Sequence, residues 1–248
     1  MTAAWIEGTV ASQTRWSDRL LSLKVEAPAV PFEAGQFARL ALDIGGERIA
    51  RPYSFVNAPG AAPLEFYYAI VGQGPLSPRL AKLAAGDRVY VAPNPAGFLV
   101  LSEVPDAANL WLLSTGTGIG PFLSILSTST PWQRFRRVVL VHAARHAAEL
   151  VYGDVLAAIA VRYPEQFALV RVTSRERADD ALQGRIPALV EDGSLEAGAT
   201  CGLSAADSQV MLCGNPDMVK DTTAVLAGRG MKKHRRRSPG HITVENYW

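Results

Sequence analysis

The segment Arg51-Pro52-Tyr53-Ser54 combines three groups that suit a phosphorylated, ring-bearing ligand. A guanidinium can grip a pyrophosphate, an aromatic ring can stack on a flat group, and a small hydroxyl can donate a hydrogen bond. The same residues would also fit an edge strand with a half-buried tyrosine, so the segment alone leaves both interpretations open.

A second segment, Gly72-Gln73-Gly74-Pro75-Leu76-Ser77, leads from an apolar run into a short helical stretch. Ser77 is a candidate helix cap, and exposed amides at that point attract an anion. An ordinary cap is the plainer alternative. Because two anion-friendly segments occur close together, they jointly favour a bound dinucleotide.

The third segment, Gly116-Thr117-Gly118-Ile119-Gly120-Pro121, directly follows an apolar run and ends in a proline that suits a first helical turn. Glycines at such a turn allow close approach of a pyrophosphate. The spacing departs from the full dinucleotide fingerprint, because Pro121 stands where that pattern has its last glycine.

Arginines follow the later apolar runs, where an NAD site usually has an acidic residue. Arg145 ends one run, Ser174-Arg175 ends the next, and Arg185 comes shortly after. Forked, charge-assisted bonds from these groups favour a 2′-phosphate, and hence NADP(H) over NAD(H). Solvated surface arginines are the alternative.

Cys213 and the chain end carry two further candidates. Cys213-Gly214 precedes a helical stretch, where a thiol can be activated. With no histidine nearby in sequence, core packing or contact with a planar ring is favoured over covalent catalysis. The terminal Tyr247-Trp248 is expected to dock, either on the core or on a cofactor ring. The four histidines show no metal-ligand spacing, so no metal is expected.

The elements that must position these residues change character near residue 105. Before it, short strand-like runs at 37–42, 66–71, 88–92 and 98–101 surround one short helix at 77–85. After it, strands at 110–115, 138–144, 167–174 and 209–213 alternate with helices at 122–127, 149–163, 186–192 and 216–226. The sequence therefore predicts a two-domain protein: an antiparallel β-barrel over 1–105 and an α/β domain with a parallel sheet over 106–248.

Composition narrows the functional classes. The 248 residues are 48% hydrophobic and carry a net charge of +2, so a sizeable core is expected and no general polyanion binder. The basic run 232–237 is a local exception. Two cysteines exclude an internal iron–sulfur cluster. The uncharged stretch 107–133 contains glycines and hydroxyls, which indicates strand, turn and helix in place of a membrane span. The N-terminus lacks a secretory signal, so a cytoplasmic location is expected.

Together, RPYS, GPLS, GTGIGP, HAAR, TSR, CGNPDMV and the terminal ENYW resemble the ferredoxin/flavodoxin–NADP reductase family, most closely its compact bacterial members. The resemblance covers essentially the whole chain. It implies an FAD-binding barrel, an NADP-binding α/β domain and a C-terminal tail that returns to the flavin.

The resemblance also implies roles for matching residues. Catalytic positions, which would tune geometry and protonation, are Ser54, Cys213 and Glu245. Plant-type members of the family end at the tyrosine, whereas this chain adds Trp248. The extra residue bears on the placement of Glu245 and Tyr247. The implied cofactor-binding residues are Arg51, Pro52, Tyr53, Ser54, Tyr67, Tyr68, Ala69, Ile70, Pro75, Leu76, Ser77, Thr117, Ala144, Arg145, Ser174, Arg175, Arg185, Gly214, Tyr247 and Trp248.

The implied activity is that of an FAD-dependent oxidoreductase. NADPH would give a hydride to the flavin, and single electrons would pass reversibly to acidic ferredoxin or flavodoxin, steered by the 232–237 run. Nucleic acid and membrane are not expected partners. Two alternatives remain: a free-flavin or oxygenase-component reductase with the same fold, and a non-catalytic flavin- or nucleotide-binding subunit.

Overall fold

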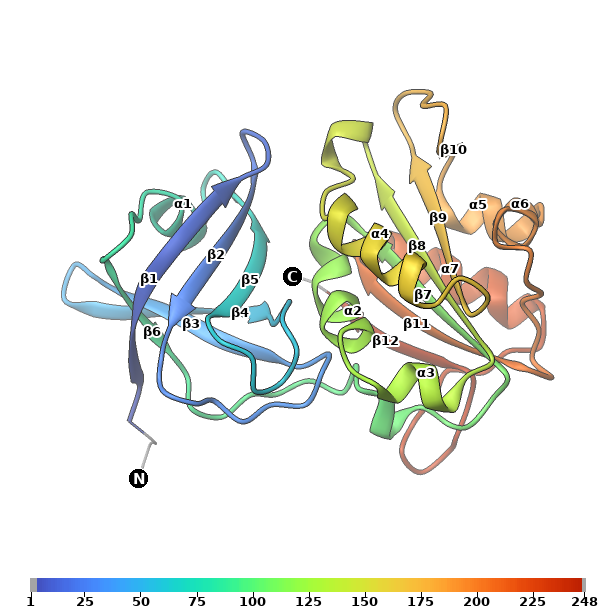
Figure 1. The fold of residues 1–248 in the computed structure, drawn as a ribbon, viewed down its shortest axis with the longest axis horizontal. Helices are drawn as coiled ribbons and strands as arrows, with labels where there is room; N and C mark the ends of the chain where they lie inside the picture. Colours follow the sequence, from blue (N-terminus) through green and yellow to red (C-terminus); the bar gives the residue numbers. More distant parts are fainter. Residues whose placement is uncertain (1–3, 247–248) are drawn as a thin grey trace. The chain divides into compact units, whose positions relative to one another are not determined.

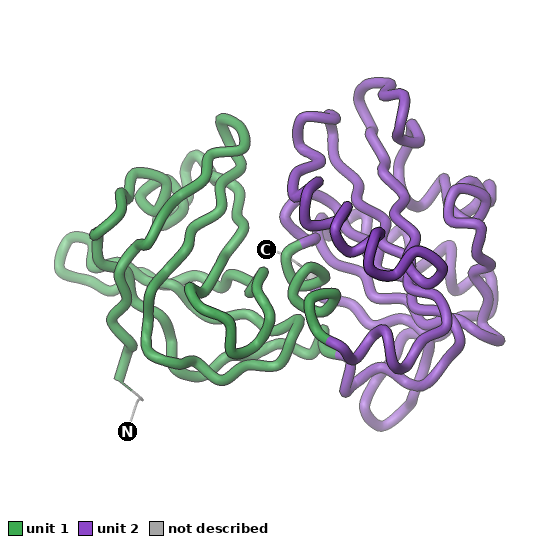
Figure 2. Tube along the Cα trace, viewed as in Figure 1, with its two compact units in different colours: residues 1–100, 120–128 green, residues 101–119, 129–248 purple. Residues whose placement is uncertain are grey.

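The computed structural model describes residues 4–246, which separate into two compact units (Figures 1 and 2). One unit comprises the chain up to Val100 together with Gly120–Thr128, and the other comprises Leu101–Ile119 and the chain from Ser129 onward. The domain boundary expected near residue 105 stays a prediction. Among the described residues, no helix is both long enough and apolar enough to cross a membrane.

The first unit is built on an antiparallel sheet of six strands in the order β4-β3-β6-β1-β2-β5. An isolated antiparallel bridge links Phe55, directly after β4, to Phe66 in β5, so the two ends of that order meet. Apolar side chains that alternate along the strands fill the interior, with Leu21, Leu23, Leu40 and Phe66 fully buried. The elements are β1 (Ile6–Arg15), β2 (Leu20–Glu26), β3 (Phe37–Ile44), β4 (Glu47–Ser54), β5 (Leu64–Ala69), α1 (Ser77–Leu80) and β6 (Arg88–Val91).

The second unit is a six-stranded sheet in the order β10-β9-β8-β7-β11-β12, and every neighbouring pair is parallel. Its central strands are nearly continuous apolar runs, as expected for a sheet covered on both faces. Its strands are β7 (Asn109–Thr115), β8 (Arg137–Ala144), β9 (Phe167–Thr173), β10 (Leu182–Gln183), β11 (Ser208–Gly214) and β12 (Ile242–Asn246).

Short helices connect these strands. Three are single 3-10 turns: η1 (Leu101–Glu103), η2 (Gly116–Gly118) and η3 (Ala147–Glu149). The α-helices are α2 (Ile119–Leu126), α3 (Thr130–Arg134), α4 (Gly153–Arg162), α5 (Ile186–Glu191), α6 (Ser194–Ala199) and α7 (Pro216–Gly228). The stretch 107–133 is thus strand, turn and helix, as predicted.

Three predicted elements are wrong or too long. Residues 98–101 form no strand but a loop that runs into η1. The helix predicted over 77–85 ends at Leu80, because the next amides bond to the third residue back, Lys82 N to Arg79 O and Leu83 N to Leu80 O. The helix predicted from residue 149 begins at Gly153, since Tyr152 takes a left-handed conformation with φ of 64°.

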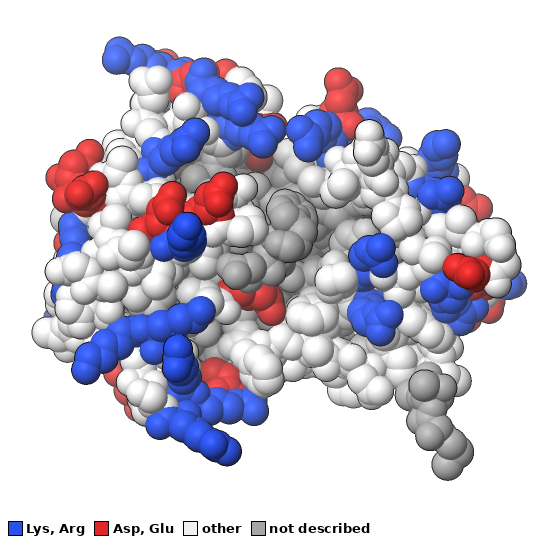
Figure 3. Space-filling model, turned by 180° about the vertical axis from the view of Figure 1, so that it is seen from behind, with Lys and Arg blue, Asp and Glu red and all other residues white. Residues whose placement is uncertain are grey.

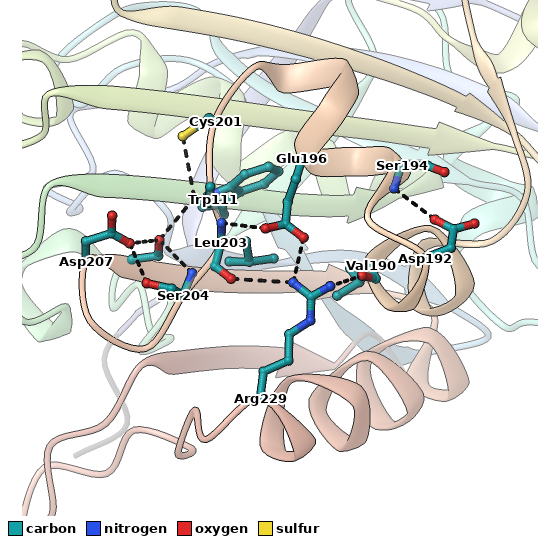
Figure 4. Close-up of polar contacts among 12 residues, drawn as sticks. Trp111, Val190, Asp192, Ser194, Glu196, Cys201, Leu203, Ser204, Asp207 and Arg229 are labelled. Atoms are coloured by element: carbon teal, nitrogen blue, oxygen red, sulfur yellow. Dashed lines mark hydrogen bonds and ion pairs between the residues drawn. The ribbon is translucent and has the colours of Figure 1, made fainter.

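A polar network fastens α5, α6 and α7 together (Figure 4). Arg229, directly after α7, pairs with the carboxylate of Glu196 on α6 at 2.6 Å and donates to the carbonyls of Val190 and Leu203. The other oxygen of Glu196 accepts from the Leu203 amide at 2.9 Å. One guanidinium therefore satisfies carbonyls from a helix and from the loop before β11.

Candidate functional site

In the first unit, Arg51 and Tyr53 lie on the same face of β4. Arg51 pairs with Leu40 on β3 and Tyr53 pairs with Ala38, and both partners are core residues. Pro52 pairs with exposed Arg39 on the opposite face. The guanidinium of Arg51 is exposed, and its hydrogen bond is to the Ala50 carbonyl at 2.7 Å. A cation is thus presented beside a tyrosine ring.

The tyrosines of β4 and β5 meet on that face. The rings of Tyr53 and Tyr68 lie edge to face with centroids 5.8 Å apart. Burial raises the pKa of both phenols above their usual range, so both hydroxyls keep their protons. Alternation turns Tyr67 and Ala69 to the other face of β5, while Ile70, just beyond the strand, packs against the core.

The sequence correctly predicts that the segment from Pro75 to Ser77 leads into a helix. The prediction that Ser77 caps this helix is wrong. Ser77 is the first residue of α1, where its hydroxyl oxygen accepts from the Val71 amide at 2.9 Å, and no side chain of residues 4–246 caps the helix. Leu76 is a fully buried core residue and Pro75 is exposed. Ser54, at the end of β4, is buried as well.

In the second unit, the sheet's carboxyl edge gathers the predicted residues. The glycine segment after β7 forms η2, with φ of +54° at Gly116 and Thr117 buried. A side chain on Gly118 would meet the Cys213 carbonyl oxygen at 2.4 Å. A glycine is therefore required at this position because the backbone at the end of β11 leaves no room for a side chain. The spacing of the glycines alone did not indicate this contact within the protein.

The end of β11 is held by Thr115 and Asn215, two residues that the sequence interpretation missed. The Asn215 amide donates to Thr115 Oγ1 at 2.9 Å, and the Asn215 side chain caps α7 by accepting from the Asp217 and Met218 amides. Gly214 has φ of +130°, and a side chain there would strike Thr115. The Asn-Pro start of α7 is a cap signature that could have identified Asn215.

The predicted arginines lie at neighbouring strand ends. The Arg175 amide donates to the Arg145 carbonyl at 3.0 Å, and Gly184, directly before Arg185, donates to Thr173 at 2.9 Å. All three arginines and Ser174 are exposed. Within residues 4–246, the three guanidiniums make no hydrogen bond or ion pair, whereas nearby Arg171 pairs with Asp180. Ala144 is buried at the end of β8.

Cys213 and Glu245 are neighbours in the sheet, paired across β11 and β12. Cys213 is fully buried. Glu245 Oε2 is buried and has no hydrogen-bond partner among the described residues, and burial raises the pKa of this carboxyl to about 7. A carboxyl group that keeps a proton near neutral pH thus lies beside a buried thiol. The predicted positions Tyr247 and Trp248 fall outside the described residues.

Comparison with known proteins places this arrangement in a family. An oxidoreductase NAD-binding domain model matches residues 112–224. The flavodoxin/ferredoxin–NADP reductase of Escherichia coli K12 is 51% identical over 247 residues, covering 99% of this chain and 100% of that protein. The chain belongs to the flavodoxin/ferredoxin–NADP reductase family.

More distant members of the family agree. The ferredoxin–NADP reductase of Pseudomonas aeruginosa is 33% identical, covering 95% of each chain. A ferredoxin NADP+ reductase from Neisseria gonorrhoeae, solved with bound FAD and NADP, superposes with a TM-score of 0.94 at 37% identity over 99% of this chain and 100% of that one. The family and the fold class that the sequence predicts are confirmed.

Proposed function

We propose that this chain uses FAD to pass electrons from NADPH to ferredoxin or flavodoxin. The observation that carries the proposal is the row formed by Arg145, Arg175 and Arg185, whose guanidiniums have no protein partner within residues 4–246. Free guanidiniums at the carboxyl edge of a parallel sheet suit a nucleotide that bears an extra phosphate.

The residues of the first unit fit FAD. Arg51 has no charged partner among the described residues and would hold the pyrophosphate, while Tyr53 offers a ring for stacking. Tyr68 supports Tyr53, and Ser54 would donate to the reacting edge of the flavin. When bound, FAD accepts two electrons as a hydride and can release them singly.

The residues of the second unit would orient the nicotinamide nucleotide and manage protons. Arg145, Ser174, Arg175 and Arg185 would bind the adenosine phosphate. At the other end, Gly214 lets the backbone approach the nicotinamide closely, and Cys213 would contact its ring. Glu245 would hold a proton on its carboxyl group near neutral pH, because burial disfavours the charged form.

The loop Lys232–Arg237, between α7 and β12, is a candidate docking surface for an acidic carrier protein. Arg236 is anchored through Nε and Nη2 to Glu103 Oε1 at 2.9 and 2.6 Å. The side chains of Lys232, Lys233, Arg235 and Arg237 have no partner in the described part of the chain. Figure 3 shows Lys and Arg side chains gathered at the lower left of that view, where this loop lies.

Anaerobic titration of the purified holoprotein with NADPH and with NADH tests the proposal. We expect a visible flavin band that bleaches faster with NADPH, and cytochrome c reduction that depends on added flavodoxin or ferredoxin. Absence of a flavin band would refute the FAD assignment. Preference for NADH would refute the 2′-phosphate site, and full activity with free flavin alone would favour the free-flavin alternative.

A further inference from the structure

Glu176 lies between the predicted phosphate-binding residues and yet bonds to neither of its arginine neighbours. Its Oε1 accepts a hydrogen bond from the Ala147 amide, and its Oε2 lies 3.3 Å from His146 Nδ1. Both partners belong to the segment that follows β8 and begins with Arg145. The carboxylate therefore links the loop after β9 to the loop after β8.

A second carboxylate closes the same segment. Glu149 Oε2 accepts from the Arg145 amide at 3.0 Å, and the Glu149 amide donates to the His146 carbonyl at 3.0 Å. On the β9 side, the Thr173 hydroxyl donates to the Glu176 carbonyl at 2.8 Å. The backbone of Arg145 is thus fastened from within its own loop and, through Ala147, from the neighbouring one.

The charged side chains in this region fall into two groups: those that bind protein partners, and arginines that have no partner among the described residues. The Ala147 amide and His146 hold the pKa of Glu176 below its usual range, so the carboxylate is ionised and engaged. Arg171 is engaged by Asp180, and Arg177 donates to Gln183 at 2.9 Å. Arg145 and Arg175 have no partner among the described residues, while Glu149, Glu176 and Asp180 bind other donors.

We propose that Glu176 is a positioning residue for recognition of the 2′-phosphate of NADPH. Its hydrogen bond to the Ala147 amide holds the Arg145 loop against Ser174 and Arg175, so that two guanidiniums converge on one phosphate without first being ordered. The inference rests on the proposed use of NADPH and assigns to this reaction a residue that does not itself touch the nucleotide.

Three variants separate the reach of the side chain from its charge. Glu176→Gln keeps an oxygen that can accept from Ala147 and removes the charge. Glu176→Asp keeps the charge and shortens the reach, and Glu176→Ala removes both. Asp179→Ala is a matched control, because Asp179 is exposed in the same connection and has no partner among the described residues.

The direct readout is calorimetric binding of 2′,5′-ADP and of 5′-AMP to the holoprotein, which requires no turnover. We expect Glu176→Ala and Glu176→Asp to weaken 2′,5′-ADP binding roughly five- to tenfold, the effect of one hydrogen bond, with 5′-AMP binding unchanged. Glu176→Gln and Asp179→Ala should bind both ligands like the wild type. The KM for NADPH should rise in Glu176→Ala and Glu176→Asp, with kcat and the KM for NADH unchanged.

Several results would overturn the assignment. One is that Glu176→Ala binds 2′,5′-ADP as tightly as the wild type. Another is that Glu176→Asp keeps 2′,5′-ADP binding while Glu176→Gln loses it. The third is that the variants lose affinity for 2′,5′-ADP and 5′-AMP in parallel. A wild type that does not distinguish 2′,5′-ADP from 5′-AMP would instead refute the proposed use of NADPH. The two failures are therefore distinguishable in one set of titrations.

Discussion

At the scale of single residues, burial decides the chemistry of Glu245. Its carboxyl pKa is raised from 4.5 in the unfolded chain to about 7 in the fold. The folded protein therefore binds more protons than the unfolded chain between these values. Stability from this group is lost as pH rises from 4.5 to 7, and the destabilisation is complete above about pH 7.

Glu245→Gln should remove this dependence, because an amide carries no charge to desolvate. At pH 8 we expect the variant to be more stable than the wild type by up to about 3 kcal/mol, at about 1.4 kcal/mol per pKa unit, with the difference vanishing near pH 4.5. Urea unfolding across this range measures it. The exposed Glu191→Gln on α5 is the control, and a constant difference at every pH would contradict the assignment.

The glycine turn offers a matched pair of substitutions. In Gly118→Ala the new Cβ would lie 2.4 Å from the Cys213 carbonyl oxygen, a backbone atom that cannot move aside cheaply. We expect a loss of about 2 kcal/mol in unfolding free energy and weaker nucleotide binding. Gly120→Ala should be neutral or stabilising, because the new Cβ would lie at an ordinary contact distance of 3.6 Å from the Val56 side chain. Gly120 lies in α2, where alanine favours the helix more than glycine does. Equal effects in a thermal melt would disprove this reasoning.

At the scale of elements, the sequence is sufficient to identify strands that are apolar throughout, but it does not show which runs pair. The apolar runs of β7, β8, β9 and β11 were predicted because a buried parallel strand reads as a continuous apolar segment. The run 98–101 is equally apolar but does not pair as a strand, a fact that depends on the rest of the fold. The arginine row was predicted from strand ends, whereas Thr115 and Glu176 act through contacts between distant segments.

The Arg229 network yields a prediction at this scale. Arg229→Ala would leave the Glu196 carboxylate and the Val190 carbonyl without their shared donor, so α5, α6 and α7 should separate more easily. We expect a loss of about 1–3 kcal/mol in unfolding free energy. Lys220→Ala, an exposed position on α7, is the control. Matching melting temperatures for the two variants would show that the network contributes nothing.

At the scale of the whole molecule, positive charge is concentrated in one loop, although the net charge of the chain is small. The net charge is only +2, yet residues 232–237 contain five lysines and arginines. Such a local field accelerates encounter with an acidic partner and is screened by salt.

Reversing charge in this loop should affect the protein acceptor alone. For Arg235→Glu we expect a roughly five- to tenfold rise in KM for flavodoxin at low salt, and a smaller rise at high salt. NADPH oxidation with ferricyanide as acceptor should be unchanged. Lys82→Glu, an exposed reversal in the first unit, serves as the control. An unchanged KM at low ionic strength would remove the loop from the docking surface.

The direction of β12 has a practical consequence for handling the protein. β12 runs parallel to β11, and Asn246 lies in register with Gly214. Any peptide fused after this strand therefore departs from the carboxyl edge that carries Thr117, Arg145 and Cys213. An affinity handle attached there would start at the edge where we propose that the nucleotide binds, so purification and labelling are better designed from the other end of the chain.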